Sequence, residues 1–405
     1  MKLLILTSLY PNPNSKFDTP VVHYYAKEWV ELGHEVRVVH LRSVFPAFFY
    51  FFAKVFKQTL KKIFQTDIIP FERLDSKIDF KHEGIDVVSQ PIFKIFPHFK
   101  YFDRTIRKQA KNIHQDNLDR QFLPDVILGH FFNPQLPLVA ELKKYYPNVK
   151  TSLVLHEKPK VVSDLFGSTA QKLFSRIDYI GFRFAEMKKE YISLFGDSNN
   201  LFICPSGIPK NYILDRIPSE KFKNEKLTFC FVGMLIPLKN IDILLEAFNA
   251  AFPERNCDLK IIGEGMLNDK IRNRIEELKL SGNVFLQGKV SRDEVQKILT
   301  DTDVFVMVSK PEAFGLVYLE AMGKGCLTIG TKGQGIDGVI EHGVNGFLCE
   351  ARNVPELTEL LQKIYLMSFE EKMAIALKAH ETASSLTDQK VASSYLAKIG
   401  VNSII

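Results

Sequence analysis

Residues 303–330, DVFVMVSKPEAFGLVYLEAMGKGCLTIG, contain one complete unit of strand, helix and strand. A β-branched run from Asp303 is followed by a loop, by a helix expected to begin at about Gly315, and by a second apolar run from Cys326. Such a unit joins two parallel strands through a helix that covers one face of the sheet. This part of the chain is therefore predicted to be an α/β domain.

The same alternation extends in both directions along the chain. In the second half, further strands are predicted at LTFCFVG (from 227), DLKIIG (from 258), NVFLQG (from 283) and NGFLC (from 345). In the first half they are predicted at LLILTSLY (from 3), EVRVVHL (from 35), DVILG (from 125), TSLVLH (from 151), YIGF (from 179) and NLFICP (from 200). The prediction is an α/β protein of two doubly wound, Rossmann-like domains with a cleft between them and C-terminal closing helices.

Changes in composition place the domain boundaries. Residues 209–226 are rich in Lys, Glu, Asn and Pro and lack apolar periodicity, which is typical of a linker. We expect an N-terminal domain at 1–210, a linker at 211–226, a C-terminal domain at 227–380 and a closing helix at 381–405.

Composition excludes several classes of protein. Of the 405 residues, 46% are hydrophobic and 25% charged, which argues against disordered, collagen-like and coiled-coil chains. The five cysteines form no C-x-x-C pair or Cys/His cluster, so neither a disulfide framework nor a metal site is expected. No apolar run approaches the roughly 18 residues of a membrane-spanning helix, and the N-terminus is interpreted as a first strand, so a cytoplasmic protein is predicted.

The net charge of +6 is unevenly distributed. Residues 1–210 contain 30 Lys and Arg against 21 Asp and Glu, or +9, whereas residues 211–405 contain 23 against 26, or −3. A basic half can face nucleic acid, an anionic membrane or a phosphorylated substrate, and the motifs must distinguish these.

Two common phosphate-binding motifs are missing from the sequence. No glycine fingerprint follows the first predicted strand, and no G-x-x-x-x-G-K-[ST] occurs. In residues 309–325, however, the N–H groups of Gly315, Leu316 and Val317 are expected at a helix N-terminus, which favours phosphate. Glu312 in the preceding loop and Glu320 in the helix can accept hydrogen bonds from sugar hydroxyls. This combination predicts a nucleotide-sugar site.

The pattern E-x-F-G-L-x-x-x-E-A-M-x-x-G, residues 312–325, resembles the signature of the retaining glycosyltransferases of family four, which have the two-domain GT-B fold. Further segments are similar to the same family: FVGMLIPLKNIDILLEAF (231–248), LKIIGEG (259–265), GVNGFL (343–348), GHEVRVV (33–39) and ICPSGIP (203–209).

The resemblance implies a retaining, metal-independent hexosyltransferase that needs no cofactor and uses a nucleoside-diphosphate sugar as donor. It makes the N-terminal domain acceptor-binding and the C-terminal domain donor-binding. Glu320 would bind the ribose hydroxyls, Glu312 the transferred sugar, and Lys239 the diphosphate. The remaining donor-side residues implied are Phe314, Gly315, Leu316, Val317, Gly263 and Val290, although Gly263 also fits a simple turn at a strand end.

Two positions depart from the family pattern. Met234 stands where the resemblance implies an arginine on the diphosphate, so another cation, Lys310 or Lys332, is expected to substitute. Residues 14–20 lack the glycine pair of many members, so Asp18 and Thr19 are expected to position the acceptor.

Two histidines follow predicted strands of the first half. The resemblance places His130 against the acceptor and the anomeric centre, where it would orient or stabilise charge while the departing phosphate takes the acceptor proton. His156 is assigned to the acceptor side. For both, a histidine in the core or the cleft wall is an equally good interpretation.

Residues 41–64 contain eight aromatic and five basic residues and no acid, the composition of a helix that lies on an anionic membrane. Residues 91–102, PIFKIFPHFKYF, are similar in kind. Both indicate a peripheral enzyme on the inner face of the cell membrane with a lipid-linked acceptor. Alternatively, the phenylalanines form domain core.

The favoured function is transfer of a sugar to a glycan or lipid-linked acceptor in cell-envelope or capsular polysaccharide synthesis. Nucleic acid is not an expected partner, because the aromatics run together with Leu and Val and do not alternate with Arg on a strand. The alternatives are a nucleotide-sugar-binding relative without transferase activity, a nucleotide-sugar epimerase and a phosphorylase of similar two-domain build. The nucleotide, the sugar and the acceptor stay open.

Overall fold

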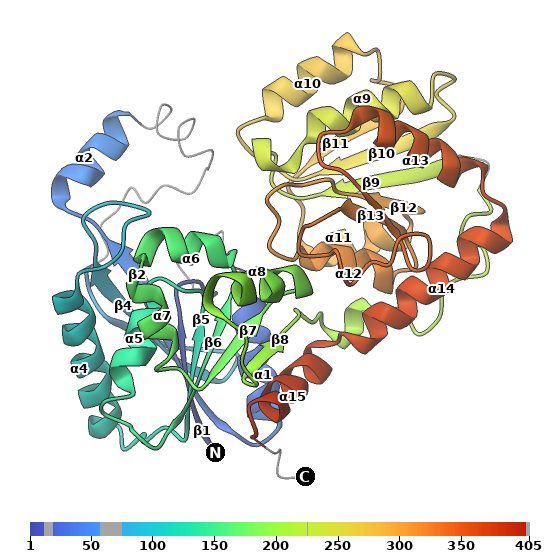
Figure 1. Ribbon diagram of the computed structural model, residues 1–405. Coiled ribbons are helices and arrows are strands. Elements are labelled where there is room, and N and C mark those ends of the chain that lie inside the picture. Colours follow the sequence, from blue (N-terminus) through green and yellow to red (C-terminus); the bar gives the residue numbers. More distant parts are fainter. Residues whose placement is uncertain (12–18, 57–74, 225, 402–405) are drawn as a thin grey trace. The chain divides into compact units, whose positions relative to one another are not determined.

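The computed structural model describes residues 1–11, 19–56, 75–224 and 226–401, which form two compact units (Figure 1). The first unit contains the described residues up to Gly207 and those from Asp388 onward. The second contains Ile208–Thr387. Each unit has its own sheet and its own apolar core, so the prediction of two Rossmann-like α/β domains is confirmed.

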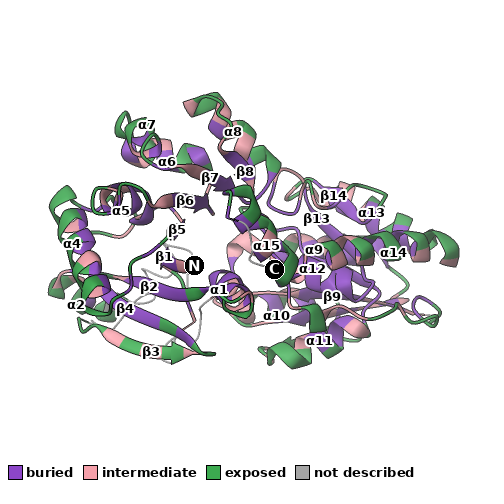
Figure 2. Cartoon of the chain, turned by 90° about the horizontal axis from the view of Figure 1, so that it is seen from below, coloured by how far each residue is buried: buried purple, intermediate pink, exposed green. Residues whose placement is uncertain are grey.

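The first unit is built on an eight-stranded sheet in the order β3-β4-β2-β1-β5-β6-β7-β8. Central strands such as β5 are buried along their whole length because helices cover both faces of the sheet (Figure 2). The strands are β1 (Lys2–Thr7), β2 (Glu35–Val44), β3 (Ile78–His82), β4 (Ile85–Phe93), β5 (Val126–His130), β6 (Lys150–Leu155), β7 (Tyr179–Phe182) and β8 (Leu201–Ile203). The helices are α1 (Val21–Glu31), α2 (Ala47–Val55), α4 (Asp103–Asp119), α5 (Gln135–Leu142), α6 (Pro159–Phe166), α7 (Thr169–Phe174), α8 (Ala185–Phe195) and α15 (Asp388–Lys398).

One edge of this sheet departs from the predicted parallel arrangement. β3 pairs antiparallel with β4, and the hairpin turns at Glu83 and Gly84, which have φ of 47° and 83°. β3 alternates half-buried and exposed residues, as an edge strand with one open face does. Neither strand of this hairpin was predicted from the sequence: the run IDFKH of β3 is too polar to stand out beside the buried strands, and β4 was also missed.

The second unit is built on a six-stranded parallel sheet in the order β11-β10-β9-β12-β13-β14. Its strands are β9 (Leu227–Val232), β10 (Cys257–Ile262), β11 (Val284–Gly288), β12 (Val304–Val306), β13 (Leu327–Thr331) and β14 (Phe347–Cys349). Its helices are α9 (Ile241–Ala251), α10 (Asn268–Glu277), α11 (Arg292–Thr300), α12 (Leu316–Gly323), α13 (Val354–Leu366) and α14 (Phe369–Ser385), with 3-10 turns η1 (Lys210–Tyr212) and η2 (Pro237–Lys239).

The segment expected as a linker, residues 211–226, lies inside the second unit. The Leu214 N–H donates to Gly323 O at 3.1 Å, the Leu214 carbonyl lies 2.7 Å from His380 Nε2, and the Phe222 side chain is buried. The chain therefore passes from the first unit to the second at Gly207, a few residues earlier than the sequence predicts.

The C-terminal helices divide between the units. α14 packs in the second unit, whereas α15 packs on α1 of the first, where Trp29 Nε1 donates to Ala392 O at 3.0 Å and Tyr395 Oη donates to Ser152 Oγ at 3.0 Å. The closing helix thus completes the core of the N-terminal domain. Across the described part of the chain, no helix has the length and apolar character needed to span a bilayer.

Candidate functional site

Three loops at the carboxyl ends of β9, β10 and β11 are joined by backbone hydrogen bonds. Gly263 N donates to Gly288 O at 2.8 Å, and Gly233 N donates to Ile262 O at 2.9 Å. Gly263 has a φ of 137°, and a Cβ there would lie 1.8 Å from Gly233 O. Only glycine fits this close approach. Val290, two residues beyond Gly288, packs its half-buried side chain against the core.

Lys239 and Glu312 form an ion pair at this end of the sheet. Lys239 ends η2, Glu312 lies in the loop after β12, and their Nζ and Oε2 atoms are 2.5 Å apart. Ser309 Oγ donates to the same carboxylate oxygen at 3.1 Å. The two charged side chains are only 17% and 12% exposed, so solvent screens their attraction weakly.

A neighbouring loop fixes the backbone around Glu312. The Glu312 N–H donates to Gln334 Oε1 at 2.9 Å, and the Gly335 N–H donates to Glu312 O at 3.0 Å. A Cβ at Gly335 would lie 2.0 Å from Ala313 O, so the two loops touch backbone to backbone. Gln334 is a residue that the sequence analysis missed, although it lies in the glycine-containing segment 332–338.

Helix α12 begins directly after this loop, at Leu316, with Gly315 in a left-handed conformation at φ 75°. Phe314 is buried, and Tyr318 Oη donates to Met307 O at 2.5 Å, so both ends of the first turn are anchored. The N–H groups of Leu316 and Val317 belong to that first turn, where a helix offers them no carbonyl partner. They are the donors that an anion would use.

Glu320 lies one turn further along α12 and is buried, with 7% exposure. Gln296 Nε2 donates to its Oε2 at 2.8 Å, and Arg292 Nη1 lies 3.8 Å from its Oε1. Burial raises the pKa of Glu320, and Arg292 and Gln296 partly oppose that shift. Neither partner was predicted from the sequence, although their spacing of four residues places them on one face of α11.

Met234, at the position where the family resemblance implies an arginine, has a side chain that is 41% exposed. Of the two lysines proposed to substitute for the arginine, Lys332 pairs with Glu356 at 2.7 Å, so its charge is already opposed. Lys310 is exposed. Its backbone N–H donates at 2.9 Å to the carbonyl of Leu238, the residue before Lys239 in the chain.

In the first unit, the structure brings His130 and His156 together, with His130 Nδ1 3.2 Å from His156 Nε2. His130 has no exposed surface and packs between the rings of Tyr25 and Tyr395, with centroids at 5.5 and 5.9 Å. Burial, and to a lesser extent the charge of Arg183, lowers the pKa of His130 to about 3, so the imidazole is neutral at pH 7. His130 is therefore an interior residue, and the half-buried His156 is the more accessible of the two.

The residues expected to position the acceptor are only partly described. Thr19 is half-buried just before α1, where its Oγ1 accepts from the Val21 N–H at 3.5 Å. Asp18 lies outside the described residues.

Comparisons with known proteins identify the family. The model of the family described as "Glycosyl transferases group 1" matches residues 215–381, which include Lys239, Glu312 and Glu320. An uncharacterized glycosyltransferase of Methanocaldococcus jannaschii is 33% identical over 304 residues, covering 72% of this chain and 78% of that protein. The chain belongs to the group 1 glycosyl transferases. The family expected from the E-x-F-G-L segment is thus confirmed.

Two further similarities place this transferase among its relatives. A poly(ribitol-phosphate) alpha-N-acetylglucosaminyltransferase of Staphylococcus aureus is 30% identical over 170 residues, which cover 42% of this chain and only 33% of that protein. The crystal structure of HepE from Anabaena in complex with UDP and glucose superimposes with a TM-score of 0.65 at 18% identity and covers 99% of each chain. This likeness confirms the GT-B fold.

Proposed function

We propose that this transferase moves a sugar from a nucleoside-diphosphate sugar to a glycan or lipid-linked acceptor, with retention of configuration and without a metal, in cell-envelope or capsular polysaccharide synthesis. The observation that carries the proposal is the ion pair of Lys239 with Glu312. Glu312 lies in the loop just before the first turn of α12, the helix that carries Glu320. The name of the Staphylococcus relative, which acts on a polymer, and the UDP and glucose bound to HepE agree with it.

Donor binding follows from the charges at the start of α12. The diphosphate would accept from the N–H groups of Gly315, Leu316 and Val317 and pair with Lys239, since its charge exceeds that of one carboxylate. Glu312 would then turn to a hydroxyl of the sugar. Glu320 would accept from the ribose hydroxyls, and the backbone at Phe314 and the turn at Gly263 and Val290 would border the nucleotide.

The transfer step needs no basic side chain in this proposal. The acceptor oxygen bonds to the anomeric carbon as the bond from that carbon to the phosphate oxygen breaks, and the acceptor proton passes to the departing phosphate. A neutral, enclosed His130 is unsuited to accept that proton, because its pKa is about 3. We assign His130 a positioning role through its 3.2 Å contact with His156.

Thermal unfolding with UDP, GDP, ADP and CMP, each with and without an attached sugar, tests the donor site. A ligand that binds only the folded protein stabilises it by about 2.7 kcal/mol at 100 times its dissociation constant. We expect one nucleoside diphosphate to raise the unfolding midpoint, and its sugar form to release the free diphosphate when a glycan acceptor is added. Stabilisation without release would support the inactive relative, and conversion of the sugar to its epimer would support the epimerase.

We also propose that the protein binds peripherally to an anionic membrane, and exposed aromatic residues at one edge of the first unit support this. We name as the aromatic rim Phe48, Phe51, Phe52, Phe56, Phe93, Phe96, Phe99 and Phe102, each of which is 43–66% exposed. They lie at or beyond the ends of the parallel neighbours β2 and β4, where Lys94 N donates to Val44 O at 2.8 Å. In α2 only Tyr50 is buried among the aromatics, so most of these rings are not core. Lys57, Lys61 and Lys62 lie outside the described residues.

The aromatic rim predicts binding to lipid vesicles. Inserting a phenylalanine contributes roughly 1.5 kcal/mol or more, so Phe48, Phe51 and Phe52 replaced together by serine should lower partitioning onto phosphatidylglycerol vesicles at least about 100-fold. Co-sedimentation measures this, with Leu366→Ser, which is 79% exposed in the second unit, as the control. Unchanged sedimentation of the triple variant would contradict the proposal.

A further inference from the structure

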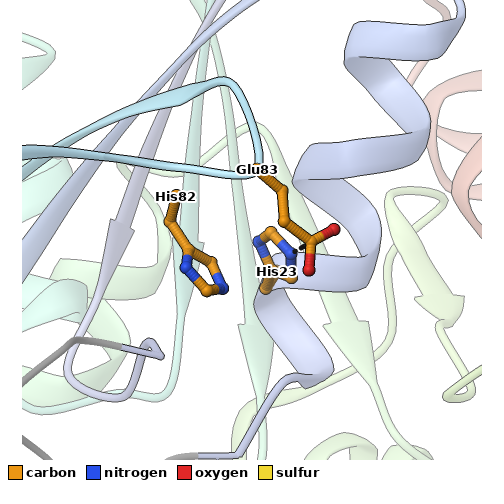
Figure 3. A group of neighbouring side chains, drawn as sticks. All are labelled: His23, His82 and Glu83. Atoms are coloured by element: carbon orange, nitrogen blue, oxygen red, sulfur yellow. Dashed lines mark ion pairs between the residues drawn. The ribbon is translucent and has the colours of Figure 1, made fainter.

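Three side chains of metal-ligand type converge in the first unit. His23 comes from the first turn of α1, and His82 and Glu83 come from the end of the β3–β4 hairpin (Figure 3). One ligand atom from each lies within 4.8 Å of the others. The sequence gives no sign of the cluster, because His23 is far from the other two along the chain and only the hairpin turn brings them together.

The spacing of the cluster suits a tetrahedral ion. Two ligand atoms that each lie about 2.1 Å from one tetrahedral ion are about 3.4 Å apart. His23 Nε2 and Glu83 Oε2 are 3.4 Å apart in this structure. The rings of His23 and His82 have centroids 4.4 Å apart, so a small rotation of the half-buried His82 brings one of its nitrogens to the same point.

His23 is oriented for ligation. Its side chain is 4% exposed, and its Nε2, apart from the 3.4 Å contact with Glu83, makes no hydrogen bond to the residues that the structure describes. Its other nitrogen, Nδ1, lies 2.9 Å from Tyr10 Oη. When Nδ1–H donates to Tyr10, the lone pair is on Nε2 and points at Glu83, which is the arrangement that metal-bound histidines adopt.

The outer side of the cluster is accessible and carries an opposing charge. Glu83 is 51% exposed, so an ion and its remaining water ligands can reach the cluster. Lys27 Nζ lies 3.0 Å from Glu83 Oε2 and must share this carboxylate with an ion. Two imidazoles with one carboxylate favour zinc and similar transition metals over calcium and magnesium, which prefer oxygen.

We propose that His23, His82 and Glu83 bind a divalent transition-metal ion of the zinc type, with Tyr10 orienting His23 from behind. The ion joins the edge hairpin β3–β4 to the first turn of α1. β3 is bonded to the sheet on one side only, so this tether stabilises the edge of the N-terminal domain.

Zinc alone, added to the full chain stripped of metal, tests this site without any donor or acceptor. Isothermal titration should show one ion bound, and cobalt in its place should give the visible absorption of a tetrahedral ion. His82→Ala and Glu83→Gln should each weaken zinc at least about tenfold, and Tyr10→Phe about tenfold. Asp86→Asn, which removes an exposed carboxylate from the same hairpin, should leave binding unchanged.

Two results would overturn the site. One is the absence of stoichiometric zinc binding to the unmodified chain, and the other is equal binding by the His82, Glu83 and Asp86 variants, which would mean adventitious metal. His82→Ala and Glu83→Gln change accessible side chains and retain His23, so the circular dichroism spectrum of each variant should match that of the unmodified protein. Zinc binding is measured without donor or acceptor, so its result does not depend on whether the protein binds a nucleotide sugar or transfers a sugar.

Discussion

Glu320→Ala is expected to lower sugar transfer to about 1% or less of the unmodified rate. Two hydrogen bonds from ribose hydroxyls to a charged acceptor contribute about 3 kcal/mol or more, which is at least about 100-fold in affinity. The fold should persist, because the variant removes a buried charge together with its desolvation cost, which offsets the loss of the acceptor of the buried Gln296 amide. Initial rates of transfer check the loss of activity, and far-UV circular dichroism checks that the fold persists.

A nucleotide analogue separates ribose binding from a general structural effect. Glu320→Gln keeps the shape of the side chain and removes its charge. If Glu320 accepts from the ribose, the unmodified protein should bind the 2′-deoxy form of its nucleoside diphosphate at least about tenfold more weakly than the ribose form, and Glu320→Gln should lose most of this preference. Glu294→Gln, an exposed carboxylate on the neighbouring helix α11, is the matched control. Equal discrimination by all three proteins would remove Glu320 from the ribose site.

The same residue gives the binding a pH dependence. Burial raises the pKa of Glu320, so on acidification it takes up its proton earlier than an exposed glutamate does. The ionised form is the better acceptor for ribose hydroxyls. Nucleotide affinity should therefore fall as the pH drops through this raised pKa, and the Gln variant should lack that part of the decline.

Much of the fold can be predicted from the sequence because its signal is local. The central strands of both sheets are short apolar runs since both of their faces are buried, as in β5 and β12, and the helix after residue 315 is marked by Gly315. The donor-site candidates Lys239, Glu312 and Glu320 all lie at the carboxyl ends of strands or in the helix that follows, where parallel sheets bind ligands.

What the sequence missed depends on contacts between distant segments. The polar edge strand β3 is held by pairing with β4 and not by its own apolar pattern. Residues 211–224 lack periodicity because they form an irregular segment that packs within the second unit, and α15 returns to α1, where Trp29 binds it. Likewise, the pairing of Lys239 with Glu312 and the convergence of His23 with His82 need the folded chain, since nothing in their spacing relates them.

Lys239→Met is expected to lower the ratio kcat/KM for the donor roughly 10- to 100-fold. The variant removes the cation that the proposal assigns to the diphosphate, and charged hydrogen bonds of this kind contribute about 1.5–3 kcal/mol. It also leaves the carboxylate of Glu312, which is 12% exposed, with Ser309 as its remaining side-chain donor in the described part of the chain. Removing one partner of a mostly buried ion pair should lower the free energy of unfolding by about 2 kcal/mol.

The double variant distinguishes the two effects. Lys239→Met combined with Glu312→Gln removes both charges, so urea unfolding should show that most of the lost stability is recovered, while transfer stays at least as low as in Lys239→Met. Lys297→Met, a 76% exposed lysine on α11, should change neither quantity. Recovery of stability together with transfer would mean that the pair is structural and that a different cation neutralises the diphosphate, and Lys310→Met would then be the variant that abolishes transfer. Persistent loss of transfer in the stable double variant is the result that places Lys239 and Glu312 on the donor.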